Sequence, residues 1–304
     1  MIEQFAGKKI VIIGLGLIGG SLARALVAAG CDCDIVGVGR DTAVLQQAIE
    51  DGSISAFTND VQTACADADL VVIAVPVLSV EAMLREIAPV LAPHAIVTDV
   101  ASVKHCVVAD ARKVFGDVPA NFVPGHPIAG SEQSGYPASK ADLFRGRKVI
   151  LTPLENTAPD AVALVDALWR ITGAEVLHMS VEHHDEVLAA TSHLPHLLAF
   201  ALVDTLSQQG ESEEIFRYAA GGFRDFTRIA SSDPVMWRDI FVTNGEATVK
   251  ILDKYMADLQ TLRAALLAGD AELLHTIFKR ARQSREAFLA LSRPVQASQD
   301  QHSK

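Results

Sequence analysis

The segment "IVIIGLGLIGGSLARALVAAG", which begins at Ile10, contains the pattern that most constrains the fold. A short run of Ile and Val precedes Gly14, Gly16 and Gly19, and an Ala-rich segment that ends at Gly30 follows them. A strand, a glycine turn and a helix in this order typify the first unit of a dinucleotide-binding sheet. We expect Gly14 to make the turn, Gly16 to let the backbone approach a pyrophosphate, and Gly19 to allow close packing of helix and strand. The alternative is a turn of small residues that binds no ligand.

Strand-like and helix-like segments continue to alternate up to about residue 180. The expected strands are "CDIVGVGRD", "ADLVVIAVP", "AIVTDVAS", "NFVPGHP", "RKVILTP" and "AEVLHMS". This alternation predicts an α/β fold with an N-terminal Rossmann-type, doubly wound parallel sheet. From Val181 onward the pattern is helical only. The segments "HHDEVLAATSHLPHLLAFALVDTLSQQG", "PVMWRDIFVTNGEATVKILDKYMADLQTLRAALLAG" and "DAELLHTIFKRARQSREAFLAL" are expected to form long helices.

These patterns divide the chain into three parts. Residues 1–180 are expected to form a dinucleotide-binding domain, residues 181–293 an all-helical substrate and dimerisation domain, and residues 294–304 a flexible tail. The long apolar helices exceed what one small bundle needs. We therefore expect a homodimer that forms through the helical domain.

Composition excludes several kinds of partner. Half of the 304 residues are hydrophobic, and 26 Lys and Arg against 37 Asp and Glu give a net charge of −11. A chain with this net negative charge lacks the positive electrostatic field that attracts nucleic acid or anionic membranes. No signal peptide or spanning helix is expected, and the four sparse cysteines suggest reduced thiols. We therefore expect a cytoplasmic protein with neither nucleic acid nor membrane as partner.

The second expected strand ends in "VGVGRD", where an acid that binds the adenosine ribose would normally stand. Gly39 removes that acid, and Arg40 can neutralise a 2′-phosphate, so NADP is preferred over NAD. The alternatives are that Asp41 reaches the ribose or that Arg40 stacks on adenine. The expected cofactor-binding residues are Gly14, Gly16, Leu17, Ile18, Gly19, Arg40, Val75, Pro76 and Ser102.

Polar loops follow the later strands, at the sheet edge where open α/β sheets bind ligands. Together with the glycine turn they supply "GLGLIGGS", "TDVASVK", "GHPIAGSE", "TSHLPH" and "GGFRDFTRIASSDPVMW", in this order. The set resembles the prephenate/arogenate (cyclohexadienyl) dehydrogenase family of tyrosine biosynthesis, from about Lys8 to beyond Trp237. The resemblance implies oxidative decarboxylation of prephenate or arogenate with hydride transfer to NAD(P), giving 4-hydroxyphenylpyruvate or tyrosine. It also implies a dimer through the helical domain. Gly39 is a departure, since many members carry an acid there.

For this reaction, His126 is the expected base. A neutral imidazole suits removal of the substrate's hydroxyl proton near pH 7. Ser102 is expected to orient both His126 and that hydroxyl. The alternatives are a strand-end His126 bonded to backbone groups and a Ser102 that caps the helix after it.

The substrate that the resemblance implies is a small anionic molecule. Its carboxylate is expected to be bound by an arginine, whose guanidinium can donate two parallel hydrogen bonds. Arg228 is expected to clamp its carboxylate, with Asp225 holding or gating that arginine. Either His193 or His196 is expected to reach the substrate across the cleft between the domains, although each could instead be a capped or core histidine. Glu132 is expected to tune an imidazole or to contact a substrate amine.

A metal site is a further possibility that the spacing argues against. His193 and His196 lie near His183 and His184, but no H-E-x-x-H pattern is present and Pro195 separates the pair. We expect no metal.

Two other functions remain open. A reductase of similar architecture for 3-hydroxy acids or imines should carry a lysine where the helical domain begins, yet none lies between Lys148 and Lys250. A non-catalytic protein that senses NADP(H) would have no use for Ser102, His126 and Arg228 together.

Overall fold

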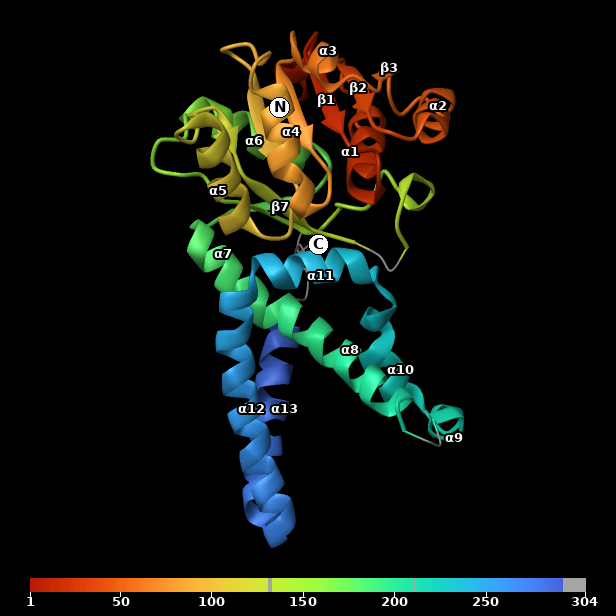
Figure 1. Cartoon of the computed structure of the whole chain (residues 1–304), viewed down its shortest axis with the longest axis vertical. Coiled ribbons are helices and arrows are strands. Elements are labelled where there is room, and N and C mark those ends of the chain that lie inside the picture. The colour runs from red at the N-terminus through yellow and green to blue at the C-terminus, as the bar shows by residue number, and fades with distance from the viewer. Residues whose placement is uncertain (131–132, 210–211, 292–304) are drawn as a thin grey trace, which may run out of the picture. The chain divides into compact units, whose positions relative to one another are not determined.

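The computed structural model describes residues 1–130, 133–209 and 212–291 (Figure 1). It consists of two compact units, Met1–Val249 and Lys250–Lys304. The predicted tail 294–304 lies outside the described residues.

The first unit is built on a six-stranded parallel sheet in the order β3-β2-β1-β4-β5-β6. The strands are β1 (Lys9–Ile13), β2 (Asp34–Val38), β3 (Ala56–Thr58), β4 (Leu70–Ile73), β5 (Ile96–Asp99) and β6 (Phe122–Val123). Ile13 pairs with Ile73, and Ile73 pairs with Asp99. The loops after β1, β4 and β5 therefore leave the same edge of the sheet. The predicted doubly wound parallel fold is confirmed.

Helices cover both faces of this sheet, because side chains along a strand alternate between them. Ile10 and Ile12 pack with helices α1, α2 and α6, whereas Val11 and Ile13 pack with α3, α4 and α5 (Figure 1). The helices are α1 (Leu17–Ala28), α2 (Thr42–Glu50), α3 (Val61–Cys65), α4 (Val80–Ile87), α5 (Lys104–Phe115) and α6 (Pro159–Ile171). Short 3₁₀ turns lie at Ile2–Phe5, Val77–Ser79 and Tyr136–Ala138.

The last three predicted strands extend the parallel sheet only in part. The segment "NFVPGHP" is divided between β6, which pairs with β5, and β7 (Gly125–Ile128). β7 forms a separate sheet with β8 (Lys148–Leu151) and β9 (Glu175–His178), in which β7 is antiparallel to β8. Pro124 ends β6 because it has no N–H to continue the ladder. The chain then turns, and the Gly125 N–H bonds to Asp99 at the end of β5. This turn carries His126 to the ligand-binding edge of the parallel sheet.

After β9 the described residues are helical, but the first predicted long helix is interrupted. It comprises α7 (Val181–Leu188), one π-helical turn (Ala189–His193) and α8 (Leu194–Ser207). Pro195, which cannot donate a backbone hydrogen bond, lies two residues after the end of the π turn. Turns of this kind inside helices are frequent at functional sites.

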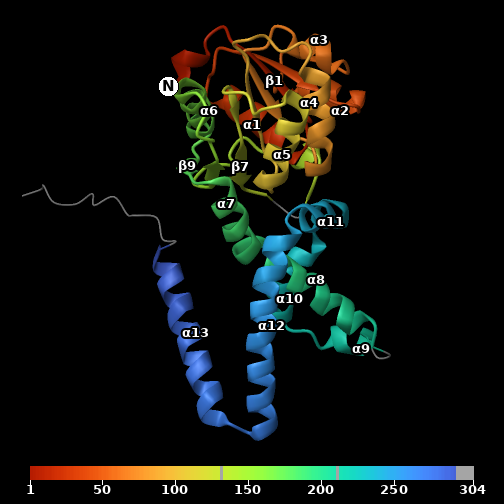
Figure 2. The same ribbon diagram turned by 60° about the vertical axis from the view of Figure 1, so that its left-hand side comes forward.

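The second predicted long helix is also broken, at Asn244 (φ −112°, ψ 34°). It is divided into α11 (Pro234–Thr243) and α12 (Gly245–Ala268). The remaining helical elements are α9 (Ser212–Arg217), α10 (Gly221–Thr227), the 3₁₀ turn η5 (Arg228–Ser231) and α13 (Ala271–Leu291). The third predicted helix is confirmed as α13, which follows a turn at Gly269 with φ +65° (Figure 2).

The run 181–207 is long and apolar enough to cross a membrane by length and composition alone. The core helices of globular proteins pass the same test. Here the run carries His184, Asp185 and His193, all buried within the first unit.

Candidate active site

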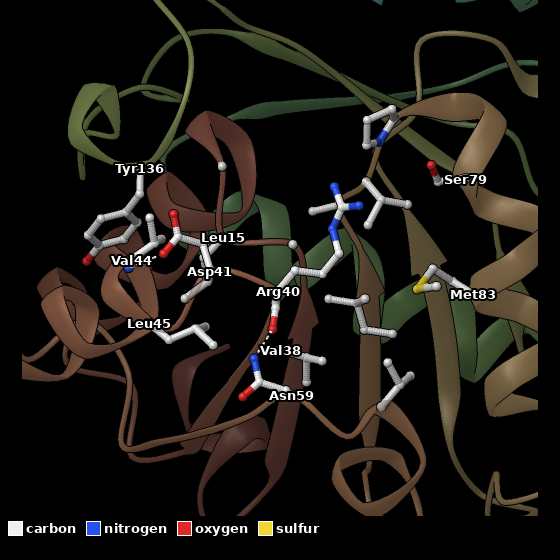
Figure 3. Close-up of a pocket in the computed structure, with 18 of the residues that line it drawn as sticks. Leu15, Val38, Arg40, Asp41, Val44, Leu45, Asn59, Ser79, Met83 and Tyr136 are labelled. Atoms are coloured by element: carbon white, nitrogen blue, oxygen red, sulfur yellow. Dashed lines mark hydrogen bonds between the residues drawn. The ribbon is translucent and has the colours of Figure 1, made fainter.

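A pocket of about 920 Å³ opens at the carboxyl edge of the parallel sheet (Figure 3). Five of the predicted cofactor-binding residues line it: Gly14, Gly16, Arg40, Val75 and Pro76. Leu17, Ile18 and Gly19 lie in the first turn of α1, directly behind the glycine turn. The pocket therefore joins the glycine turn to the loop after β4.

The three glycines differ in what surrounds them. Gly14 has φ +100°, and a Cβ there would lie 2.4 Å from the Ala74 carbonyl oxygen. A Cβ on Gly19 would lie 2.1 Å from the Gly14 carbonyl oxygen, so this glycine lets α1 approach the turn. A Cβ on Gly16 would meet nothing within 4 Å. Gly16 is the N-cap of α1 and faces open space, which is the geometry that a pyrophosphate at a helix N-terminus requires.

The far end of the pocket is formed by the segment after β2. The Asp41 carboxylate accepts hydrogen bonds from the amides of Ala43 (3.0 Å) and Val44 (3.4 Å), and so caps α2. Asn59 holds the Gly39 carbonyl oxygen at 2.6 Å. The Arg40 side chain extends into the middle of the pocket (Figure 3). Both charged side chains line the pocket, but the Asp41 carboxylate is engaged by the amides that begin α2, whereas Arg40 extends into the open space.

His126 lies on β7, buried against α7, and heads a chain of three side chains. Its Nδ1 lies 2.9 Å from Nε2 of His184, and Nδ1 of His184 lies 2.7 Å from Oδ1 of Asp185. The Asp185 carboxylate also accepts hydrogen bonds from the backbone amides of Lys104 (2.9 Å) and His105 (2.8 Å). The chain therefore ends at the N-terminus of α5, where amide groups and the helix dipole favour a negative charge.

The backbone beside His126 is held by a buried ion pair. Lys104 and Asp99 are both 0% exposed, and they are bonded to each other. Lys104 Nζ also donates to the Gly125 carbonyl oxygen (2.6 Å), while Asp99 accepts from the Gly125 amide (3.2 Å). Gly125 is therefore fixed through both of its backbone polar groups. The segment "TDVASVK" stood out in the sequence, but these roles of its charged residues did not.

A second group of side chains lies around the π turn. Asn244 Nδ2 donates to the Asp185 carbonyl oxygen (3.0 Å) and lies 3.1 Å from Nδ1 of His193. Since an amide nitrogen only donates, His193 Nδ1 must accept, and its proton lies on Nε2. His196 Nδ1 donates to the Ser192 carbonyl oxygen (2.9 Å), which leaves its Nε2 as an acceptor. The two predicted substrate histidines therefore offer opposite hydrogen-bonding groups.

Trp237 of α11 packs against His196 and His193 and also against the apolar side chains on one face of the parallel sheet. Its ring stacks on His196 with centroids 3.7 Å apart, and it meets His193 edge-on at 6.0 Å. Its Nε1 is buried with no hydrogen-bond partner among the described residues. Trp237 also belongs to the apolar cluster on the α4 and α5 face of the sheet.

Burial determines the charge of these histidines. It lowers the pKa of His126 well below its ordinary value, and the charges of His184, Lys104 and His193 act in the same direction. Burial likewise lowers the pKa of His184, against the bond to Asp185 that raises it. The pKa of His193 falls to about 4, and that of His196 is also lowered. All four imidazoles are therefore neutral at pH 7.

The pKa of Asp185 is lowered too, but against the effect of burial rather than because of it. Burial alone would raise the pKa of its carboxyl group, but hydrogen bonds from His184 and from the Lys104 and His105 amides outweigh burial and lower it. A neutral His126 thus faces a neutral His184 that is backed by an ionised carboxylate.

The remaining predicted residues are placed as follows. Ser102 is half-buried in the loop after β5 and precedes Val103, the N-cap of α5. It does not cap that helix, because the Asp185 carboxylate bonds the first amides instead. Arg228 begins η5, one turn after Asp225 in α10, and both are exposed. Glu132 lies outside the described residues.

A parallel sheet with a glycine turn, a pocket at its carboxyl edge and a helix N-terminus facing that pocket defines a dinucleotide-binding protein of the Rossmann class. Comparison with known proteins narrows the class. Residues 22–178 match the family model "prephenate dehydrogenase, nucleotide-binding domain", and residues 180–280 match "prephenate dehydrogenase, dimerization domain". The chain belongs to the prephenate dehydrogenase family, as its motifs predicted.

Individual relatives agree with this assignment. The chain is 40% identical to a cyclohexadienyl dehydrogenase of Zymomonas mobilis over 93% of its own length and 96% of the relative. It is 38% identical to a prephenate dehydrogenase of Bacillus subtilis, over 92% and 76% respectively. The crystal structure of Aquifex aeolicus prephenate dehydrogenase with hydroxyphenyl propionate and NAD+ superposes with a TM-score of 0.87, at 36% identity, over 93% of this chain and 99% of that one.

Proposed function

We propose that this protein oxidises and decarboxylates prephenate, arogenate or both, giving 4-hydroxyphenylpyruvate or tyrosine. Family membership supports the reaction, and one observation supports the site: a buried, neutral His126 whose Nδ1 is bonded to His184. Its other nitrogen, Nε2, is then free to act as the base. When bound, the nicotinamide supplies the acceptor for a hydride.

The chain's own residues supply position and proton transfer. His126 takes the proton of the substrate hydroxyl, and Ser102, in the loop beside it, orients that hydroxyl. Hydride loss leaves a ring ketone, and loss of CO2 then gives the aromatic phenol. The burial of His126 excludes water from the reacting centre, which strengthens each polar interaction there.

The substrate is anionic, so the site must supply cationic and polar contacts. We assign Arg228 to a substrate carboxylate, with Asp225 one turn away to hold it. To the rest of the substrate, His193 offers an Nε2–H donor and His196 offers an Nε2 acceptor. Glu132 completes the proposed set of substrate-binding residues.

NADP is the proposed preferred cofactor, with NAD as the alternative. Arg40 extends into the pocket, Gly39 carries no carboxylate, and Asp41 is bonded to the amides that begin α2. A guanidinium in this position favours a 2′-phosphate over a 2′-hydroxyl. The relative from Aquifex aeolicus was solved with NAD+. The proposed NADP preference therefore rests on Gly39, Arg40 and Asp41 of this chain and not on that relative.

The assembly is proposed from the family, and the location from the class of substrate. We propose that residues 1–180 bind the cofactor and that residues 181–293 bind substrate and form a homodimer. The family model of the dimerization domain matches residues 180–280, all but the first of which lie in that second range. A cytoplasmic location fits an enzyme that acts on small anionic metabolites.

Initial rates with prephenate or arogenate, each with NAD or NADP, test the activity and the cofactor together. We expect turnover with at least one substrate and a higher kcat/KM with NADP. Arg40→Gln should lower the ratio of kcat/KM with NADP to kcat/KM with NAD about tenfold or more, since a charged hydrogen bond contributes roughly 1.5–3 kcal/mol. No turnover in any combination, with cofactor still bound, would reject the proposed activity.

A further inference from the structure

The line of side chains from His126 through His184 to Asp185 goes beyond what the reaction itself requires. We propose that His184 is a positioning residue, which holds His126 in the tautomer with an unprotonated Nε2 and keeps accepting from its Nδ1–H while the proton is transferred. The inference rests on the proposed function, because it assigns a role to the support of the proposed base.

The direction of each hydrogen bond follows from the last acceptor in the line. The Asp185 carboxylate accepts from two backbone amides, at 2.9 Å and 2.8 Å, so it is the acceptor toward His184 as well. Nδ1 of His184 must therefore donate across the 2.7 Å contact. In a neutral imidazole the other nitrogen is then an acceptor. Nε2 of His184 accepts, and Nδ1 of His126 donates across the 2.9 Å contact.

The surroundings keep His184 neutral and hence an acceptor. It is 0% exposed, with Lys104 of α5 on one side and His126 and His193 near it. A second positive charge in this buried group would be opposed by Lys104, and burial acts against it too. Asp185 and Asp99 act in the opposite direction, but Asp99 is already paired with Lys104. One carboxylate therefore orients His184 without protonating it.

The proton balance of the step shows why the orientation matters. As the hydride leaves the ring carbon, the substrate O–H bond breaks, its electron pair forms the ketone, and the proton forms a bond to His126 Nε2. The resulting imidazolium carries N–H groups at both nitrogens, and Nδ1–H still donates to His184. With the opposite tautomer, Nε2 already carries a proton and cannot take another. Elsewhere, a wrong histidine tautomer lowers rates by up to about 10⁴-fold.

Two substitutions at one position separate the two hydrogen bonds of His184. The glutamine amide extends to about the position of Nε2, whereas the asparagine amide extends only to about that of Nδ1. His184→Gln can therefore still accept from His126, and His184→Asn can still donate to Asp185. We expect kcat to fall on the order of 10²-fold in H184N and less than about tenfold in H184Q, with KM and cofactor Kd changed less than threefold in both.

A spectroscopic measurement reads the tautomer directly and does not depend on turnover. Long-range ¹H–¹⁵N correlations on ¹⁵N-histidine-labelled protein with cofactor bound distinguish the protonated ring nitrogen, and His126→Asn identifies the His126 signals. We expect a His126 proton on Nδ1 in the unsubstituted protein and in H184Q, and a proton on Nε2 in H184N. Thermal unfolding checks that each variant is folded.

The outcomes are distinct. A His126 proton on Nε2 in the unsubstituted protein, or the same tautomer in H184N as in H184Q, would overturn the inference. So would a changed tautomer in H184N with unchanged kcat. If the protein turned over neither substrate, the proposed function would fail, while the NMR result would still show whether His184 sets the tautomer.

Discussion

His193 shows how a single buried residue makes stability depend on pH. The side chain is 1% exposed, its Nδ1 faces the Asn244 amide, and Trp237 and Phe241 surround its ring. Few polar groups compensate for a charge on this imidazole. A neutral His193 therefore belongs to the folded state, and its protonation opposes folding.

Acid should destabilise the protein partly through this residue. The imidazole has an ordinary pKa of 6.5, whereas the pKa of folded His193 is about 4. Between these values the unfolded chain binds more protons, so stability falls as pH drops from 6.5 toward 4, and this group adds no further loss below that. Since each pKa unit corresponds to 1.36 kcal/mol, the full effect is roughly 3 kcal/mol.

Urea unfolding above pH 6.5 and near pH 4, at one protein concentration, measures this loss. His193→Asn is the matched variant, because its Oδ1 can accept the Asn244 bond but does not titrate. We expect its stability to depend less on pH than that of the unsubstituted protein. Equal pH dependence in both proteins would show that the imidazole is not responsible.

The residue scale also shows the limits of sequence reasoning. The motifs placed His126 and Ser102 in loops at the carboxyl edge of the sheet. The structure has Ser102 in the loop after β5, and His126 on β7, whose first residue is bonded to the end of β5. The bonds of His184 and Asp185 to His126 and α5 could not be predicted, because they join residues about 58 to 81 positions apart. Such contacts depend on how α7 packs, which no local pattern specifies.

At the scale of elements, two glycines of the turn between β1 and α1 have different roles, one in packing and one in the proposed ligand binding. Gly19 touches the backbone of Gly14, while Gly16 faces open space. The two glycines therefore predict opposite effects when each is replaced by alanine.

Gly19→Ala should lower the thermal midpoint by several °C, because a Cβ within 2.1 Å of the Gly14 carbonyl forces a backbone shift that costs about 1–3 kcal/mol. Gly16→Ala should leave the midpoint within about 2 °C but raise the cofactor Kd about tenfold or more, because the methyl group occupies space proposed for the pyrophosphate. Differential scanning fluorimetry and a cofactor titration check both. Unchanged cofactor binding in folded G16A would count against this placement.

The elements differ in how far their sequence patterns predicted them. The β1-α1 unit followed directly from its pattern, as did β2, β4 and β5 with the helices after them. The short β3 and α3 were missed, because three and five residues are too few to show a clear periodicity. The antiparallel β7 did not, because strand direction depends on the turn at Pro124 rather than on the composition of "GHPI". The breaks at the π turn and at Asn244 were missed since apolar periodicity continues across both.

At the scale of the whole molecule, the proposed dimer accounts for apolar side chains that a monomer would leave in water. In the second unit, Phe278 and Phe288 of α13 are 57% and 58% exposed, and Leu266 and Leu267 of α12 are exposed as well. Large exposed apolar residues of this kind mark interaction surfaces. A second copy of the chain is the occupant that the family's dimerisation domain implies.

Sedimentation equilibrium should therefore give twice the 32.4 kDa chain mass. Phe278→Glu should raise the dimer dissociation constant about tenfold or more by placing a charge in the apolar contact. Gln283→Glu is the control, since it adds the same charge on the side of this exposed helix that faces away from both Phe278 and Phe288. Dissociation by both variants alike, or by neither, would place the interface elsewhere.

The measurement that tests the central claim most directly is the rate of His126→Asn with the preferred substrate and cofactor. The asparagine amide can still donate to His184 but cannot accept the hydroxyl proton. We predict that kcat falls about 10²–10⁴-fold with an unchanged cofactor Kd, and that exposed His183→Asn retains the full rate. A kcat in H126N within threefold of the unsubstituted protein would contradict the assignment of His126 as the base.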